Sequence, residues 1–188
     1  TGNGHVFSSA HVSEDEATAV LLANLDGEPL AEPRTLRFRT GMRRQCWKGN
    51  VVAVGLSSGF LEPLESTSIH LIQTAIARLI DFFPSRGFSA EDTDEYNRQA
   101  RFEYERIRDF IILHYHLNER TDSPFWTACR EMPVPGTLQA KMRLFATHGR
   151  IERRDSELFS EVARGQVMLG QGLMTAAYPP LVDSPDEA

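Results

Sequence analysis

The feature that most constrains the fold of this chain is the stretch from Gly49 to Pro84, GNVVAVGLSSGFLEPLESTSIHLIQTAIARLIDFFP. It opens with a short apolar run, which predicts a buried strand over Val51–Val54 that ends at Gly55. Apolar residues then recur at helical spacing until Pro84, which predicts a helix that stops there. A chain that passes from a strand through small residues into a helix commonly binds a ligand at that turn.

Other elements follow from helix caps, periodicity and breakers. Ser13 with Glu16 is a capping-box pattern, and Ser89 with Asp92 resembles a second cap. The sequence RTGMRRQ predicts a turn, and RTDSPFW predicts a loop that leads into a short helix. The remaining predictions are strands over His5–Ser9 and Leu36–Arg39, and helices over Ala17–Leu25, Ile69–Phe83, 90–117, Pro135–Thr147 and Glu157–Leu173.

Composition predicts a folded chain that is neither a nucleic-acid binder nor a membrane protein. The 188 residues are 41% hydrophobic, which is enough for a core, and the order of elements predicts an α+β piece that is mostly helical. The net charge of −6 argues against a dedicated nucleic-acid binder, and no run of about 18 apolar residues is present to span a membrane. We interpret Cys46 and Cys129 as reduced thiols in apolar niches of a cytoplasmic protein.

Two polar patterns have plain interpretations. The spacing of His114 and His116 does not predict a metal site, because residues two apart on a helix point in different directions. The basic residues before Gly49 predict a solvated face, while contact with another domain or a partner protein remains open. These basic residues are Arg34, Arg37, Arg39, Arg43, Arg44 and Lys48.

The turn after Val54 has two possible functions. Its small residues, including Gly55 and Gly59, would let a flat cofactor or a phosphate approach the backbone closely. Glu65 stands just before the helix, whose first amides lack intrahelical acceptors and can bind an anion. The alternatives are tight packing at the glycines and capping of the helix by Glu65.

At this point the residues resemble a known family. The segment GNVVAVGLSSGFLEPLESTSIHLI resembles the signature of the flavin-dependent tryptophan halogenases, and its LEPLEST core is highly specific. TGNGHVFSS and HYHLNERTDSPFW resemble two further segments of that family in the same order, so the resemblance runs from Thr1 to about Leu173. It implies part of an FAD-dependent, two-layer fold that is similar to flavin monooxygenases. The chain has neither the family's G-x-G-x-x-G fingerprint nor its catalytic lysine in the expected context. We therefore expect a C-terminal portion whose nucleotide-binding half is missing, and which is inactive alone.

The resemblance also implies a chemistry. Halogenases of this family use reduced FAD from a separate flavin reductase, dioxygen, and chloride or bromide to halogenate an aromatic substrate such as tryptophan or an indole. By this resemblance Glu65 is the catalytic residue, and the backbone amides of Thr67 and Ser68 hold the halide. Ser68 stands where the family usually has glycine, a change that a backbone amide tolerates if the dihedral angles allow it. Gly55, Leu56 and Ile69 fall on flavin-contacting positions.

The third matching segment carries the implied substrate residues. Phe125 and Trp126 match aromatic residues that border the indole, although Trp126 in the core is the alternative. Tyr115 matches a tyrosine near the amino-acid end of the substrate, and His114 stands where another tyrosine is usual. Thr121 stands where a glutamate binds the substrate ammonium, and its loss removes a charge-assisted contact. An indole, a phenol or a tryptophan carried in another molecule therefore fits as well as free tryptophan.

The expected organisation has three parts. Residues 1–84 form a strand-rich segment with the flavin and halide motif and the first helix, residues 85–178 form a helical substrate-side subdomain, and residues 179–188 form a flexible tail. A homodimer is possible. Two other functions remain open: another FAD-dependent aromatic monooxygenase, and a non-catalytic remnant that serves as an interaction module.

Overall fold

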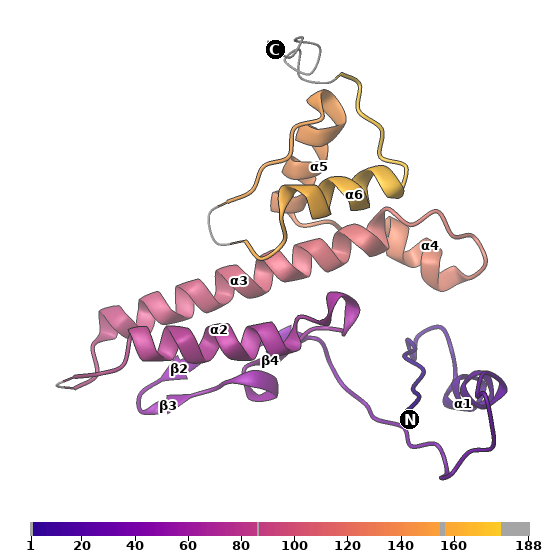
Figure 1. Cartoon of the computed structure of the whole chain (residues 1–188), viewed down its shortest axis with the longest axis horizontal. Coiled ribbons are helices and arrows are strands. Elements are labelled where there is room, and N and C mark those ends of the chain that lie inside the picture. The colour runs from indigo at the N-terminus through magenta and orange to yellow at the C-terminus, as the bar shows by residue number, and fades with distance from the viewer. Residues whose placement is uncertain (1, 86, 155–156, 178–188) are drawn as a thin grey trace, which may run out of the picture.

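A computed structural model describes residues 2–85, 87–154 and 157–177 (Figure 1). The predicted tail at 179–188 lies outside these described residues. Helices dominate the described chain, in agreement with the mostly helical α+β prediction, and none of them is both long and apolar enough to cross a membrane. The elements are α1 (Glu14–Ala23), β1 (Gly41–Met42), β2 (Trp47–Lys48), β3 (Val51–Val52), the 3₁₀ helix η1 (Gly55–Ser57), β4 (Gly59–Phe60), the 3₁₀ helix η2 (Leu64–Ser66), α2 (Ser68–Asp81), α3 (Ala90–His116), α4 (Pro124–Glu131), α5 (Gly136–His148) and α6 (Glu161–Gly170).

The 27-residue helix α3 is the element on which α2, α4, α5, α6 and β2 pack. Figure 1 shows α2 and the strands on one side of α3, α5 and α6 on the other, and α4 beyond its C-terminal end. Burial along α3 follows this arrangement, with one apolar cluster against β2, one against α2 and one against α5 and α6. The buried residues of these clusters are Cys46, Trp47, Tyr96 and Ala100; Leu71, Tyr104, Ile107 and Ile111; and Phe110, Leu113, Leu138, Phe145 and Met168.

Helix starts follow local capping. The predicted capping box before α1 is confirmed, because the Ser13 hydroxyl accepts from the Glu16 amide and the Glu16 carboxylate accepts from the Ser13 amide. The predicted cap of α3 is also confirmed, with the Asp92 amide 3.1 Å from the Ser89 hydroxyl. Each of these bonds joins residues only three positions apart, so the local sequence is sufficient to specify it.

The strand predictions were mostly wrong. The structure has two short antiparallel pairs, β1 with β4 and β2 with β3. The segments His5–Ser9 and Leu36–Arg39 are not strands, and β1 lies inside the segment predicted as a turn. Within Val51–Val54 only the first two residues form a strand, and Val51 is 64% exposed rather than buried. A strand requires a partner for its backbone groups, and an apolar run alone does not specify that partner.

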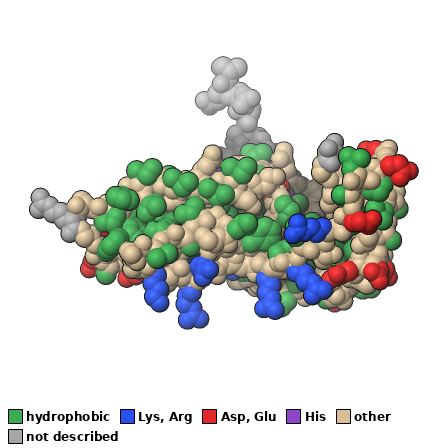
Figure 2. Space-filling model, turned by 90° about the horizontal axis from the view of Figure 1, so that it is seen from below, with side chains coloured by type: hydrophobic (Ala, Val, Ile, Leu, Met, Phe, Trp, Pro, Cys, Tyr) green, Lys and Arg blue, Asp and Glu red, His purple; other side chains and the backbone are tan. Residues whose placement is uncertain are grey.

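Helix α2 matches its predicted range, but it presents an unexpected face to α3. Its buried residues are Leu71 and Ala75, whereas Ile69, Ile76 and Ile80 are exposed. Figure 2 shows hydrophobic side chains spread over this underside of the molecule. The isoleucine periodicity therefore correctly predicts a helix, yet most of those isoleucines lie outside the core of the described chain.

Helix α6 begins later than predicted. Ser160 caps it by accepting from the Ala163 amide, so Glu157 precedes the helix instead of starting it. The Glu157 side chain is fully buried and binds Lys141 of α5 and Arg164 of α6. Burial in this ion cluster, rather than helix geometry, accounts for the position of Glu157.

Candidate functional site

The candidate site begins at an unusual backbone turn. In η2, Glu65 has φ 67° and Ser66 has φ 53°, the left-handed conformation that residues other than glycine seldom adopt. Pro63 precedes them with φ −76° and ψ 2°. Conformations of this kind cost about 1–3 kcal/mol each and cluster at functional sites, where the surrounding structure holds them. The turn places Glu65 just before the N-terminus of α2, outside that helix.

The start of α2 offers unpaired backbone donors. The first hydrogen bond of the helix joins the Leu71 amide to the Thr67 carbonyl at 3.0 Å, so the amides of Ser68, Ile69 and His70 precede the intrahelical pattern. Thr67, the N-cap residue, makes no side-chain capping bond. The positive end of the helix dipole adds to these donors, and this end of α2 can therefore bind a small anion.

Two contacts join this turn to the last turn of α3. Glu65 Oε1 lies 3.2 Å from His114 Nε2, so Glu65 contacts α3 instead of capping α2. The Tyr115 hydroxyl donates to Glu62 Oε2 at 2.5 Å. Burial, the hydrogen bond to Glu62 and the negative charge of Glu62 raise the pKa of Tyr115 far above its ordinary value. Glu62, to which the sequence assigned no role, is thus part of the site; its position three residues before Glu65 was the available signal.

The predicted aromatic residues do gather beside these carboxylates. The Tyr115 and Trp126 rings are stacked with centroids 6.0 Å apart, and the Phe125 ring meets both edge-on. The Arg120 guanidinium lies over the Trp126 ring at 4.3 Å. The buried Asn118 side chain donates to the carbonyls of Tyr115 and Trp126, which fixes α4 against the end of α3.

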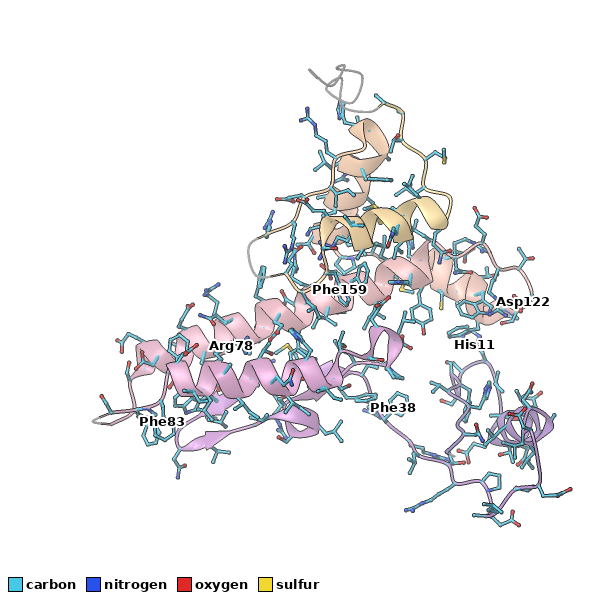
Figure 3. All side chains as sticks on the ribbon, in the orientation of Figure 1. His11, Phe38, Arg78, Phe83, Asp122 and Phe159 are labelled. Carbon is cyan, nitrogen blue, oxygen red and sulfur yellow. The ribbon has the colours of Figure 1, made fainter. Side chains whose placement is uncertain are left out.

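Thr121 lies apart from this aromatic group. It is exposed on the loop between α3 and α4 and borders an open depression together with Pro124 and Thr127. Its neighbour Asp122 is paired with Arg120. The N-terminal segment reaches this region as well, since the His11 ring meets the Phe125 ring edge-on at 5.6 Å (Figure 3).

The expected flavin positions lie on the surface beside the start of α2. Gly55 has φ 65°, and a Cβ atom there would lie 3.3 Å from Ile72 Cγ1, so glycine allows η1 to pack against α2. Leu56 is 79% exposed and Ile69 is 69% exposed. A flat apolar group could therefore lie on this surface and contact the backbone, which fits an isoalloxazine ring.

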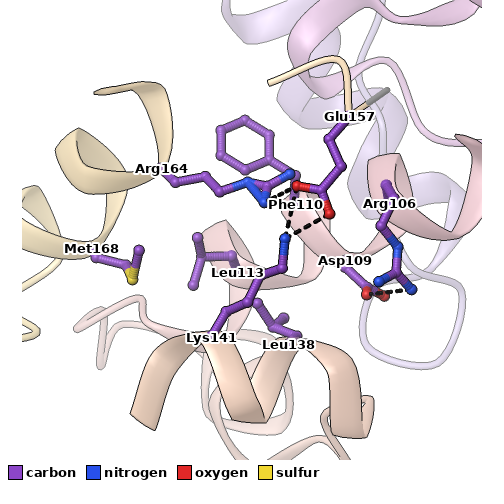
Figure 4. Close-up of a pocket in the computed structure, with 9 residues that line it drawn as sticks. All are labelled: Arg106, Asp109, Phe110, Leu113, Leu138, Lys141, Glu157, Arg164 and Met168. Carbon is purple, nitrogen blue, oxygen red and sulfur yellow. Dashed lines mark hydrogen bonds and ion pairs between the residues drawn. The ribbon is translucent and has the colours of Figure 1, made fainter. Parts of the chain in front are cut away.

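A buried ionic cluster lies away from this site, around a cavity of about 10 Å³ between α3, α5 and α6 (Figure 4). Lys141 Nζ lies 2.6 Å and 2.7 Å from the two carboxylate oxygens of Glu157, and Arg164 lies 2.5 Å from one of them. Burial lowers the pKa of the Lys141 ammonium, and the Glu157 carboxylate partly opposes that shift. These contacts join α5 and α6 through the segment that holds Glu157.

Solved structures with a similar fold show the class of protein to which this chain is related. The chain is similar to Xcc4156, a flavin-dependent halogenase from Xanthomonas campestris, with 47% identity and a TM-score of 0.89. It is also similar to BrvH, a flavin-dependent halogenase from Brevundimonas sp. BAL3, with 53% identity and a TM-score of 0.89. Each match covers 94% of this chain and 36% of the solved chain. The fold is therefore that of one part of a flavin-dependent halogenase.

The chain belongs to the tryptophan halogenase family, whose sequence profile matches residues 1–187. It is 37% identical over 145 residues to the tryptophan 7-halogenase RebH of Lentzea aerocolonigenes. That match covers 77% of this chain and 27% of RebH, so the chain spans about a quarter of the length of this relative. The family expected from the LEPLEST motif is confirmed.

Proposed function

We propose that this chain is the C-terminal part of an enzyme that halogenates an aromatic substrate with reduced FAD, dioxygen and chloride or bromide. The observation that carries the proposal is the convergence at one end of α2. A carboxylate on a strained turn, unpaired amides and a group of stacked aromatic rings meet there. Family membership and the likeness to flavin-dependent halogenases support it.

The proposed roles follow the geometry. The amides of Thr67 and Ser68 hold the halide at the positive end of α2. Ser68 is not among the described residues with positive φ, so its side chain imposes no backbone strain there. The exposed backbone around Gly55, Leu56 and Ile69 faces the flavin. When bound, reduced FAD with dioxygen supplies the oxidising equivalents that make the halide electrophilic.

Glu65 is the proposed catalytic base. When the ring carbon that received the halogen loses its proton, the electron pair of the C–H bond returns to the ring and the proton passes to the Glu65 carboxylate. Phe125, Trp126 and Tyr115 hold the ring, and His114 lies at the same end of α3. Thr121 supplies no carboxylate for an ammonium group, so we propose an indole or phenol as the substrate, or tryptophan carried in a larger molecule.

The exposed apolar face of α2 has a proposed role in the complete enzyme. Ile69, Ile76 and Ile80 would pack against the nucleotide-binding half, and a dry wall there would keep water from consuming the oxidant. A separate flavin reductase would supply reduced FAD. In this proposal residues 1–84 form the cofactor side and residues 85–178 form the substrate side.

The test uses the complete enzyme with a flavin reductase, bromide and a panel of indoles and phenols. We expect a brominated product with bromide, and no turnover of the aromatic substrate without halide. Glu65→Gln should abolish bromination while FAD still binds, whereas Glu28→Gln, in an exposed loop, should leave it unchanged. A crystal soaked in bromide should show an anomalous peak at the Thr67 and Ser68 amides. Hydroxylated product without halide, or full yield from Glu65→Gln, would contradict the proposal.

A further inference from the structure

The last turn of α3 holds both acidic residues of the motif turn. His114 and Tyr115 are adjacent in the sequence, and they contact Glu65 and Glu62 respectively. The Tyr115 hydroxyl approaches Glu62 at 2.5 Å and anchors the first carboxylate. Among the described residues, His114 is the one side chain within ion-pair distance of Glu65. The Glu65 side chain is 38% exposed, and the contact with His114 is what joins its carboxylate to α3.

The contacts of His114 fix the position of both ring nitrogens. Nδ1 lies 2.8 Å from the Phe110 carbonyl oxygen, which can only accept, so Nδ1 carries a proton. Nε2 lies 3.2 Å from Glu65 Oε1, within ion-pair distance, so Nε2 is the ring nitrogen that faces the carboxylate. The imidazole is also fixed in orientation, because it meets the Phe110 ring edge-on with centroids 4.7 Å apart.

We propose that His114 is the positioning residue for Glu65. It holds Oε1 through the contact with Nε2 and so leaves Oε2 to face the reacting ring. This inference rests on the proposed function, and it assigns to His114 a role beyond lining the substrate site. A residue that orients a catalytic carboxylate in this way acts on the rate of the chemical step rather than on substrate binding.

The experiment compares three substitutions of His114 in the complete enzyme, with bromide and whichever aromatic substrate of the panel the wild type brominates best. His114→Phe keeps a flat ring but removes both nitrogens, and we expect kcat to fall about 10- to 100-fold with KM changed less than about twofold. His114→Gln places an amide N–H near the position of Nε2 and should recover most of kcat. His114→Leu should resemble His114→Phe.

A double-mutant comparison separates positioning from general damage to the fold. If any bromination remains detectable in the Glu65→Gln background, adding His114→Phe should not lower it further, because the carboxylate that it positions is absent. FAD affinity and melting temperature should match the wild type in each variant. His148→Phe, an exposed histidine at the end of α5, serves as the control and should leave kcat unchanged.

The outcomes distinguish this inference from the proposed function. Bromination by the wild type, combined with the same kcat in His114→Phe, would overturn the positioning role alone. An effect of His114→Phe on KM but not on kcat, or an additive effect in the Glu65→Gln background, would also overturn it. A wild-type enzyme that gives no halogenated product from any panel member would overturn both.

Discussion

The buried cluster of Lys141, Glu157 and Arg164 allows a quantitative prediction. Glu157→Gln keeps the size and shape of the side chain but removes its charge, so it leaves two cations without the carboxylate between them. The Glu157 side chain is 0% exposed, and those of Lys141 and Arg164 are 9% and 6% exposed, so water cannot replace the lost partner. Removing one member of a buried ion pair costs about 3–5 kcal/mol.

The expected consequence is local opening of α5 and α6. A tenfold change in an equilibrium constant corresponds to about 1.4 kcal/mol, so 3–5 kcal/mol should raise the population of the opened state by roughly a hundred- to a few thousand-fold. Amide hydrogen exchange of α5 and α6 in the complete protein measures this directly. Amides in the first half of α3, which packs against β2, should change much less.

Glu152→Gln is the matched control. Glu152 pairs with Arg154 at 3.1 Å, but their side chains are 43% and 58% exposed, and an exposed pair of this kind contributes about 0.2–1 kcal/mol. Replacing the whole cluster, with Lys141→Met, Glu157→Leu and Arg164→Leu together, should cost less than Glu157→Gln alone, because no buried charge is left unpaired. Equal exchange in Glu157→Gln and Glu152→Gln would refute the reasoning.

Two further predictions concern packing and pH. A Cβ atom at Gly59 would lie 2.6 Å from the Gly41 carbonyl oxygen, so Gly59→Ala should separate β1 from β4. In urea titrations this should lower the free energy of unfolding by about 1–3 kcal/mol. As a control, Gly136→Ala should not destabilise the protein, because a Cβ atom there meets open space. Because the pKa of Tyr115 is raised in the folded state, its contribution to stability is present below its unfolded pKa of about 10 and is lost as pH rises above that value. Between pH 9 and 11, about one unit on either side of that pKa, the melting temperature of Tyr115→Phe should therefore fall less than that of the wild type. An equal fall in melting temperature in both proteins would contradict this.

Helix positions were predictable from the sequence because their signals are local. The caps at Ser13 and Ser89 act over three residues, and Pro84 ends the helical pattern close to the observed end of α2. Strands were not predictable in the same way. The segment Leu36–Arg39, in which apolar and charged residues alternate, forms no strand within the described chain. Gly41 and Gly59, which have no side chains to form a pattern, lie in paired strands.

The sequence alone determined the family, the residues of the motif turn and most of the helices, because each of these depends on residues close together in the chain. Only the tertiary structure decided which face of α2 packs against α3. It also decided that His114 contacts Glu65 and that Tyr115 contacts Glu62. The Tyr115–Glu62 contact joins residues 53 positions apart. Contacts over such distances depend on how whole helices pack, and no local pattern encodes which side chains meet when they do.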